Sequence, residues 1–218
     1  MLPSLLIMAK HPRPGGAKTR LCPPLTPGQA ARVADALLRE TLALARRVPG
    51  VQVGLATTPD EAEANAFFAD LAPDLLRLPQ GPGDLGIRLA HVTGAALAAG
   101  APAVAALSSD SPSLPVAYLS QAFAALAEHD LSIGPTEDGG YYLAALRQPA
   151  PSLFTRPPMS HPDTFARTLA VATDLGLRVA ILPTWYDVDT FEDLQRLAVD
   201  PGLRPHLRAT LADLDCGF

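Results

Sequence analysis

Lysine is the residue that this sequence most conspicuously lacks. Only two of its 17 basic residues are lysines, Lys10 and Lys18, and both lie near the start of the chain. Every other basic residue is an arginine, whose planar guanidinium group differs from the compact ammonium group of a lysine. The two lysines belong to a loop rich in proline and glycine, residues 10–21, which also carries Arg13 and Arg20. This basic loop is either a phosphate cradle or a solvated surface loop.

An excess of positive charge and long hydrophobic runs are also missing. The net charge is −5, which argues against broad binding to nucleic acids or to anionic membranes. The most apolar span, residues 94–107, is broken by Gly100 and Pro102 and is too short to cross a bilayer. Residues 5–9 are too short for the apolar part of a signal peptide. We therefore expect a cytoplasmic protein without a membrane span.

Cysteine is limited to Cys22 and Cys216, which are far apart and lack the spacing of a metal site. Two reduced thiols are the expected state, and nothing in the pattern indicates a disulfide. The 218 residues include 48% hydrophobic and 18% charged side chains, so the chain is globular. That length suffices for one full α/β core or for two small domains.

Short apolar runs alternate with longer amphipathic segments through about residue 134, which predicts a three-layer α/β domain. No linker divides the chain, so residues 1–218 are expected to form a single domain with a proline-rich flap at 147–161. Strands are predicted at 4–9, 51–56, 75–78, 103–107, 131–134, 141–146 and 178–182. Helices are predicted at 26–47, 60–73, 115–128, 162–175, from Thr190 onward, and at Leu203–Leu214, the last as a surface helix. A further helix is predicted to carry Arg88 in its first turn and to end at about residue 99.

Asp110 follows one of these apolar runs directly. Residues 103–107 are small or branched and lead into Ser108-Ser109-Asp110, as in a strand buried on both faces. Open α/β sheets bind ligands beyond the carboxyl ends of their strands, which makes Asp110 a candidate metal ligand. The competing interpretation is that Asp110 caps the next helix.

Two further acidic stretches have a chemical and a structural interpretation. Asp138 lies in a Glu-Asp-Gly-Gly connection that is either a plain turn or a pocket wall. Asp187 and Asp189 would point to the same side of an extended segment, an arrangement that suits a hard divalent cation. The alternative is that Asp189 or Thr190 caps the helix that follows.

Two common nucleotide-binding motifs are absent from the first loop. A Walker loop needs glycines where this chain has Pro12 and Ala17, and no G-x-G-x-x-G follows the first strand. The loop at residues 80–86 contains three glycines. It is either a plain turn or a place where a base or sugar approaches the backbone closely.

Five motifs follow one another along the chain: Lys10-x-Pro-x-Pro-Gly-x-x-Lys-Thr-Arg-Leu21, Gly83-Asp-Leu-Gly-x-Arg-Leu89, Ser109-Asp-Ser-Pro112, Gly134-Pro-x-x-Asp-Gly-Gly-Tyr-Tyr142 and Asp187-Val-Asp-Thr-x-x-Asp-Leu194. Together, in this order, they resemble the DUF2064 family of glycosyltransferase-like bacterial proteins. That family is similar to the nucleotide-diphospho-sugar transferases and to the phospholactate and phosphoenolpyruvate guanylyltransferases. The resemblance spans roughly residues 4–198.

The resemblance implies a Rossmann-like fold of the glycosyltransferase A type, with a mixed, mostly parallel sheet. It implies that Asp110, Asp187 and Asp189 hold one or two Mg²⁺ or Mn²⁺ ions. Lys18 and Arg20 would contact phosphates and, with Asp110 and Asp138, form the predicted catalytic set. The implied nucleotide-binding residues are Lys10, Pro14, Gly15, Lys18, Arg20, Gly83, Asp84, Gly86 and Arg88.

The sequence departs from the glycosyltransferase pattern at the central strand. Many glycosyltransferases of this fold carry Asp-x-Asp there, whereas this chain has a single carboxylate, Asp110. The guanylyltransferase-like relatives also have a single carboxylate at this place. This similarity favours transfer of a nucleotidyl group from a nucleoside triphosphate over transfer of a glycosyl group from a nucleotide-sugar. Met159-Ser160-His161 replaces a Trp-Ser pair of the relatives, so no acceptor contacts carry over.

The function expected is therefore a cation-dependent transferase with a nucleotide substrate and a small acceptor. A catalytically idle nucleotide sensor or scaffold on the same fold is the alternative. The base, the sugar, the acceptor and the oligomeric state stay open at this level.

Overall fold

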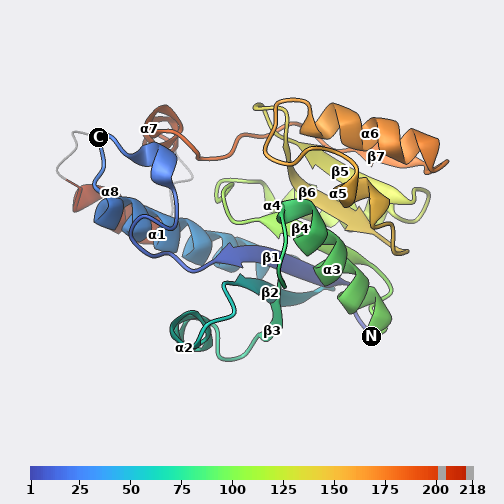
Figure 1. Ribbon diagram of the computed structural model, residues 1–218, viewed down its shortest axis with the longest axis horizontal. Coiled ribbons are helices and arrows are strands. Elements are labelled where there is room, and N and C mark those ends of the chain that lie inside the picture. The colour runs from blue at the N-terminus through green and yellow to red at the C-terminus, as the bar shows by residue number, and fades with distance from the viewer. Residues whose placement is uncertain (201–204, 215–218) are drawn as a thin grey trace.

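The computed structural model describes residues 1–200 and 205–214, and its centre is a seven-stranded sheet. The strand order is β3-β2-β1-β4-β6-β5-β7 (Figure 1). Only β6 runs antiparallel to its neighbours among these strands. This confirms the mixed, mostly parallel sheet. The strands are β1 Ser4–Lys10, β2 Gln52–Thr58, β3 Leu76–Pro79, β4 Val104–Ser108, β5 Leu131–Pro135, β6 Tyr141–Leu146 and β7 Val179–Ile181.

Helices cover both faces of the sheet, because successive strand residues point to opposite sides. Leu5 and Ile7 of β1 pack with side chains of α1, α2 and α4, whereas Leu6 packs with α3. The same face as α3 also holds α5 and α6. The predicted three layers are thus confirmed. The helices are α1 Pro27–Ala45, α2 Ala62–Leu71, α3 Leu85–Ala98, α4 Val116–Ala125, α5 Ser152–Thr155, α6 Thr164–Asp174, α7 Phe191–Ala198 and α8 Pro205–Ala212; a 3₁₀ turn, η1, covers Thr19–Leu21.

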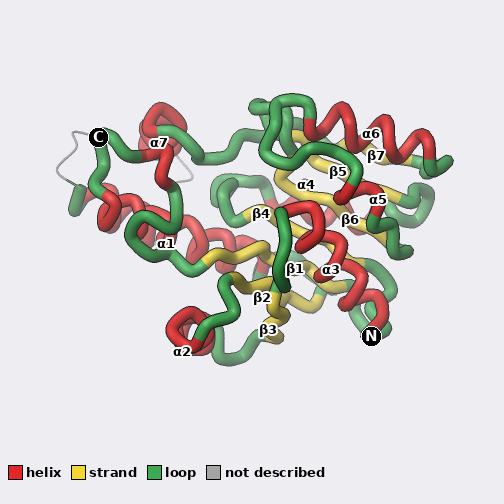
Figure 2. Tube along the Cα trace, viewed as in Figure 1, coloured by secondary structure: helices red, strands yellow, loops and turns green. Residues whose placement is uncertain are grey.

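A second, smaller apolar cluster lies at one end of the molecule. There α7 and α8 gather beside α1, well away from α6 (Figures 1 and 2). Tyr186 and Val188, which precede α7, are buried in the same cluster. The segment that carries Asp187 and Asp189 is therefore anchored by apolar side chains on either side of Asp187.

Helix ends follow the sequence signals in two cases. Thr26 and Thr190 each cap their helix in a capping box, with Gln29 and Asp193 as the reciprocal partners. The cap of α4 is Pro115, so Asp110 does not cap that helix. Leu203, the predicted start of the last helix, and Cys216 lie outside the described residues. Cys22 is a free thiol.

The last helix, α8, is a surface helix as predicted: most of its residues are exposed, and Leu207 and Leu211 are buried against α1. Another segment differs from the sequence interpretation. The proline-rich segment 147–161 contains the short helix α5, whose Leu153 and Phe154 are buried. Among the residues that the structure describes, no helix has both the length and the apolar character needed to cross a bilayer.

Candidate functional site

The candidate site forms where four separate parts of the chain meet at one edge of the sheet. The carboxyl ends of β1 and β4 lead into the basic loop and into Asp110. Because β6 is antiparallel, the turn before it, residues 136–140, reaches the same edge. Residues 185–190, which we call the strap, cross this edge: Val188 N–H donates to the Asp110 carbonyl (2.9 Å), and Glu137 N–H donates to the Trp185 carbonyl (3.0 Å).

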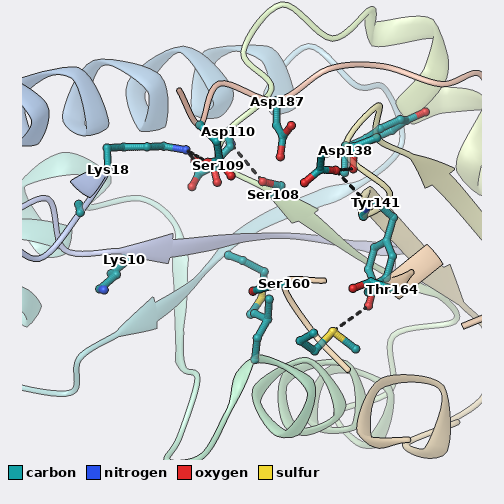
Figure 3. A pocket seen from close by; sticks show the side chains of 18 of the residues that line it. Lys10, Lys18, Ser108, Ser109, Asp110, Asp138, Tyr141, Ser160, Thr164 and Asp187 are labelled. Atoms are coloured by element: carbon teal, nitrogen blue, oxygen red, sulfur yellow. Dashed lines mark hydrogen bonds and ion pairs between the residues drawn. The ribbon is translucent and has the colours of Figure 1, made fainter. Parts of the chain in front are cut away.

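Lys18 is the cation at the centre of this arrangement (Figure 3). Its Nζ lies 2.8 Å from Asp110 Oδ1 and 2.8 Å from Asp189 Oδ1, and its side chain is only 9% exposed. Burial alone would lower the pKa of Lys18, but the attraction of the two carboxylates outweighs it and raises that pKa. Lys18 is therefore a fixed positive charge. Arg20 reaches Asp189 at 3.5 Å from a largely solvated position.

Asp187 lies in a contrasting environment. Burial, reinforced by repulsion from Asp138, Asp189 and Asp110, raises its pKa to about 7. No cation among the described residues pairs with this carboxylate. For Asp189, burial would raise the pKa, but Lys18 and Arg20 hold it below the ordinary value. Neighbouring carboxylates of the strap are thus in opposite electrostatic states.

Asp138 is held in place by its own turn. Its Oδ1 accepts hydrogen bonds from Thr136 Oγ1 (2.5 Å) and from the Gly140 N–H (2.9 Å). Gly139 adopts a φ of +89°, and a Cβ there would collide with the Pro162 carbonyl, so the turn requires glycine. The turn thereby packs against the segment leading into α6 and presents Asp138 beside the strap.

The carboxylates form a donor set that fits a hard divalent cation. One oxygen each from Asp138, Asp187 and Asp189 lies within 4.8 Å of the others. Oxygen ligands of this kind suit Mg²⁺ and Mn²⁺. Asp187, with its unpaired and partly buried charge, provides the observation that favours a cation here. Asp110, a predicted metal ligand, is not part of this group of three; like Asp189, it pairs with Lys18.

A cavity of about 740 Å³ opens beside these groups. Several of the predicted site residues line it and several do not. The predicted residues that line it are Lys10, Lys18, Arg20, Arg88, Asp110, Asp138, Asp187 and Asp189. Pro14, Gly15, Gly83, Asp84 and Gly86 are not among its lining residues.

Two of the predicted site residues that do not line the cavity, Asp84 and Gly86, have structural roles. Asp84 caps α3 by accepting the Ile87 N–H at 2.9 Å. Gly86 is buried, and a Cβ on it would collide with the Phe154 carbonyl. The glycine-rich loop thus owes part of its composition to close packing between α3 and α5, a cause that local sequence does not reveal.

The cavity also has lining residues that sequence reasoning did not assign to the site. Gln80, 4% exposed, donates from Nε2 to the carbonyls of Ala56 (2.8 Å) and Ala9 (3.3 Å). Tyr141, Ser160 and His161 also line the cavity. Tyr141 lies within the motif that runs from Gly134 to Tyr142. Gln80, by contrast, is a single glutamine beside glycines, a pattern that indicates no particular function.

Comparison with known proteins identifies the family. A family described as an uncharacterized protein conserved in bacteria, DUF2064, matches residues 22–161, well over half of the chain. The chain belongs to the DUF2064 family. The match includes Asp110 and Asp138, while Lys18 and the strap lie outside it. A search of curated proteins gives no match for this DUF2064 protein.

Solved structures extend the likeness to nearly the whole chain. A protein from Desulfovibrio desulfuricans G20, provisionally named a nucleotide-diphospho-sugar transferase, has a TM-score of 0.89 and is 29% identical over 96% of this chain and 94% of that one. A CMP:2-keto-3-deoxy-manno-octonic acid synthetase solved with CTP has a TM-score of 0.59 and 14% identity, over 97% and 99% of the two chains. Rv0371c of Mycobacterium tuberculosis H37Rv, solved with manganese, has a TM-score of 0.52 and 19% identity, over 90% and 98%. The two more distant likenesses concern the fold alone.

Proposed function

We propose that this DUF2064 protein is a divalent-cation-dependent nucleotidyltransferase that acts on a nucleoside triphosphate and a small acceptor. The observation that carries the proposal is the buried Lys18 between Asp110 and Asp189, beside the unpaired carboxylate of Asp187, in one cavity. Opposed fixed charges of this kind suit a metal–phosphate substrate. The names of the similar structures, which include a synthetase solved with CTP, support a nucleotide substrate.

Each charged group has a role in the proposed reaction. Asp187 and Asp189, with Asp110 or Asp138, would hold Mg²⁺ or Mn²⁺, which supplies positive charge to the phosphates when bound. Lys18 and Arg20 would bind the phosphate oxygens, and the more distant Lys10 and Arg88 would help to position the nucleotide.

The proposed chemistry is an in-line displacement. An acceptor oxygen attacks the α-phosphorus, the bond to the bridging oxygen breaks, and pyrophosphate leaves. Lys18 and Arg20 stabilise the charge that develops on the leaving oxygens. Asp138 orients the acceptor, or takes its proton when the acceptor is a hydroxyl group. The reaction is expected in the cytoplasm and requires neither nucleic acid nor a membrane.

Glycosyl transfer is the second candidate, and the name of the Desulfovibrio protein favours it. In that reaction the acceptor attacks the anomeric carbon of a nucleotide-sugar, and a nucleoside diphosphate leaves. The single carboxylate at the end of β4 favours nucleotidyl transfer. The two reactions release different products, so one assay separates them.

The test supplies each of the four nucleoside triphosphates, labelled at the α-phosphate, with Mg²⁺ or Mn²⁺ and a small-molecule extract as the source of acceptors. Transfer of label to a new product with release of pyrophosphate is expected. Asp187→Asn should lower the rate by at least about 100-fold, because it removes charge at the centre of the site. Asp74→Asn, an exposed partner of Arg46, is the matched control and should leave the rate unchanged.

Two outcomes would contradict the proposal. In a parallel assay with nucleotide-sugars, release of a nucleoside diphosphate, without turnover of any triphosphate in the first assay, would establish glycosyl transfer instead. Nucleotide binding without turnover of either substrate class would favour the sensor or scaffold.

A further inference from the structure

Lys18 occupies a place that a cation ligated by Asp110 and Asp189 would also require. Its ammonium is 2.8 Å from an oxygen of each carboxylate, and its side chain is nearly buried. These two carboxylates come from different segments, one after β4 and one on the strap. We propose that Lys18 is an internal counter-ion that competes with the divalent cation for Asp110 and Asp189, and that an anion must draw Lys18 away before the cation gains both ligands.

The charges around the cavity support this competition. Four carboxylates, those of Asp110, Asp138, Asp187 and Asp189, line the same cavity. Among the described residues, the cations that pair with them are Lys18 and the largely solvated Arg20, whose charge is screened by water. With Lys18 in place, Asp110 and Asp189 are compensated and Asp187 is not. Without the Lys18 ammonium group, all four carboxylates would be available to bind a divalent cation.

An anionic ligand provides the means of exchange. A phosphate oxygen can replace a carboxylate as the partner of an ammonium group, since both form charge-assisted hydrogen bonds. When Lys18 moves to the phosphate, Asp110 and Asp189 lose their positively charged partner. A divalent cation would replace that positive charge. Metal and nucleotide binding are therefore coupled, and by linkage each tightens the other.

This inference rests on the proposed function for the identity of the cation and of the anion, but its test requires no turnover. The test titrates the metal-free protein with Mn²⁺, followed by calorimetry and by the electron paramagnetic resonance signal of free Mn²⁺. Lys18→Met should bind Mn²⁺ more tightly than the wild type by on the order of tenfold, within the usual range of coupling between sites.

Two controls separate competition from a general loss of positive charge. Arg13→Met removes a cation of the same loop that pairs with Glu61, away from the carboxylates, and should leave Mn²⁺ affinity unchanged. Arg20→Met removes a cation next to Asp189 that does not lie between two carboxylates, and should change the affinity by less than about threefold, as for an exposed ion pair. Equal tightening by Arg20→Met and Lys18→Met would overturn the proposal.

A double-mutant cycle with Asp110→Asn tests the competition directly. In the wild type, Asp110 is paired with Lys18, so the Asp110→Asn substitution should change Mn²⁺ affinity by less than about twofold. In the Lys18→Met background, Asp110 is free to ligate, and its loss should weaken Mn²⁺ by on the order of tenfold. The same factor in both backgrounds would overturn the proposal.

A second neutral variant guards against a folding defect. Lys18 has a positive φ of 49°, which glycine adopts without strain, so Lys18→Gly removes the ammonium group while suiting the backbone. It should tighten Mn²⁺ as Lys18→Met does. Unchanged affinity in a folded Lys18→Gly protein would overturn the proposal, even if nucleotidyl transfer were demonstrated. Conversely, a failed transferase assay would leave the outcome of the titration intact.

Discussion

At the scale of single residues, Asp187 is a carboxylic acid whose pKa lies far from its value in water. Its pKa is raised from 3.8 to about 7, first by burial and then by three neighbouring carboxylates. The folded state therefore favours the protonated form. The stability that this contributes is complete below about pH 4 and is lost as the pH rises through 7.

Asp187→Asn should remove this pH dependence, because asparagine stays neutral. Between pH 5 and pH 8 the stability of the variant relative to the wild type should rise by roughly 1–2 kcal/mol, a value reduced for partial exposure of the carboxylate. Urea denaturation in the presence of a metal chelator measures the difference. Asp74→Asn, at the exposed pair with Arg46, should show no such trend. A constant difference for Asp187→Asn would contradict the expected raised pKa.

We expect the same residue to make the binding of a divalent cation depend on pH. Below pH 7 a proton competes with the cation for Asp187, so Mn²⁺ affinity should fall by up to about tenfold per pH unit. In Asp187→Asn the remaining pH dependence should be weaker over pH 5.5–7. Titrations of Mn²⁺ at several pH values check this. Parallel pH profiles for both proteins would show that Asp187 is not the titrating group.

The sequence alone identifies the charged residues of the site as candidates, but it does not predict which of them pair with one another. Lys18 and Asp189 are separated by 171 positions, and nothing local indicates which carboxylate meets the ammonium group. Asp138 belongs to the predicted catalytic set, and its position beside Asp187 depends on how the turn before β6 meets the strap. The roles given to these side chains stay predictions.

At the scale of secondary structure elements, the contact between α3 and α5 depends on one glycine. Gly86→Ala should destabilise the protein by about 1–3 kcal/mol, because the new Cβ collides with the Phe154 carbonyl. Gly94→Ala is the matched control in the same helix, where a Cβ meets nothing within 4 Å. It should stabilise the protein by about 0.5–1 kcal/mol. Thermal denaturation compares the two, and equal effects would contradict this account.

The position of α8 depends on a carboxylate from another helix. Glu40 of α1 is 1% exposed, and its Oε1 accepts the N–H of His206 at 2.7 Å, at the start of α8. Glu40→Ala should cost about 1–2 kcal/mol of stability, the usual cost of losing a helix cap. Glu40→Gln keeps an acceptor oxygen and should lose less than half as much. Denaturant titration measures both, and equal losses would show that the hydrogen bond is unimportant.

The elements themselves were largely predictable. Apolar runs located all seven strands, and capping signals located the starts of α1 and α7. The helix α5 was missed because Pro149 and Pro151 and the nearby serines resemble a loop. It is stabilised by burial of Leu153 and Phe154 against other elements, which a local pattern does not contain.

At the scale of the whole molecule, ligands that bind only the folded chain should raise its melting temperature. For a nucleoside triphosphate with Mg²⁺ or Mn²⁺ at about 100 times its dissociation constant, the rise should be roughly 5–10 °C. Nucleotide without the cation should give a smaller shift. A thermal-shift series with and without a chelator checks this. No shift with any of the four triphosphates would contradict the proposed nucleotide site.

Two of the candidate metal ligands, Asp187 and Asp189, come after the whole sheet in the chain. All seven strands are complete by Ile181, whereas Asp187 and Asp189 follow later and are anchored among α1, α7 and α8. A premature stop codon shortly after position 181 would therefore spare the coding sequence of every strand. The shortened product would nevertheless be unable to assemble the acidic pair opposite Lys18.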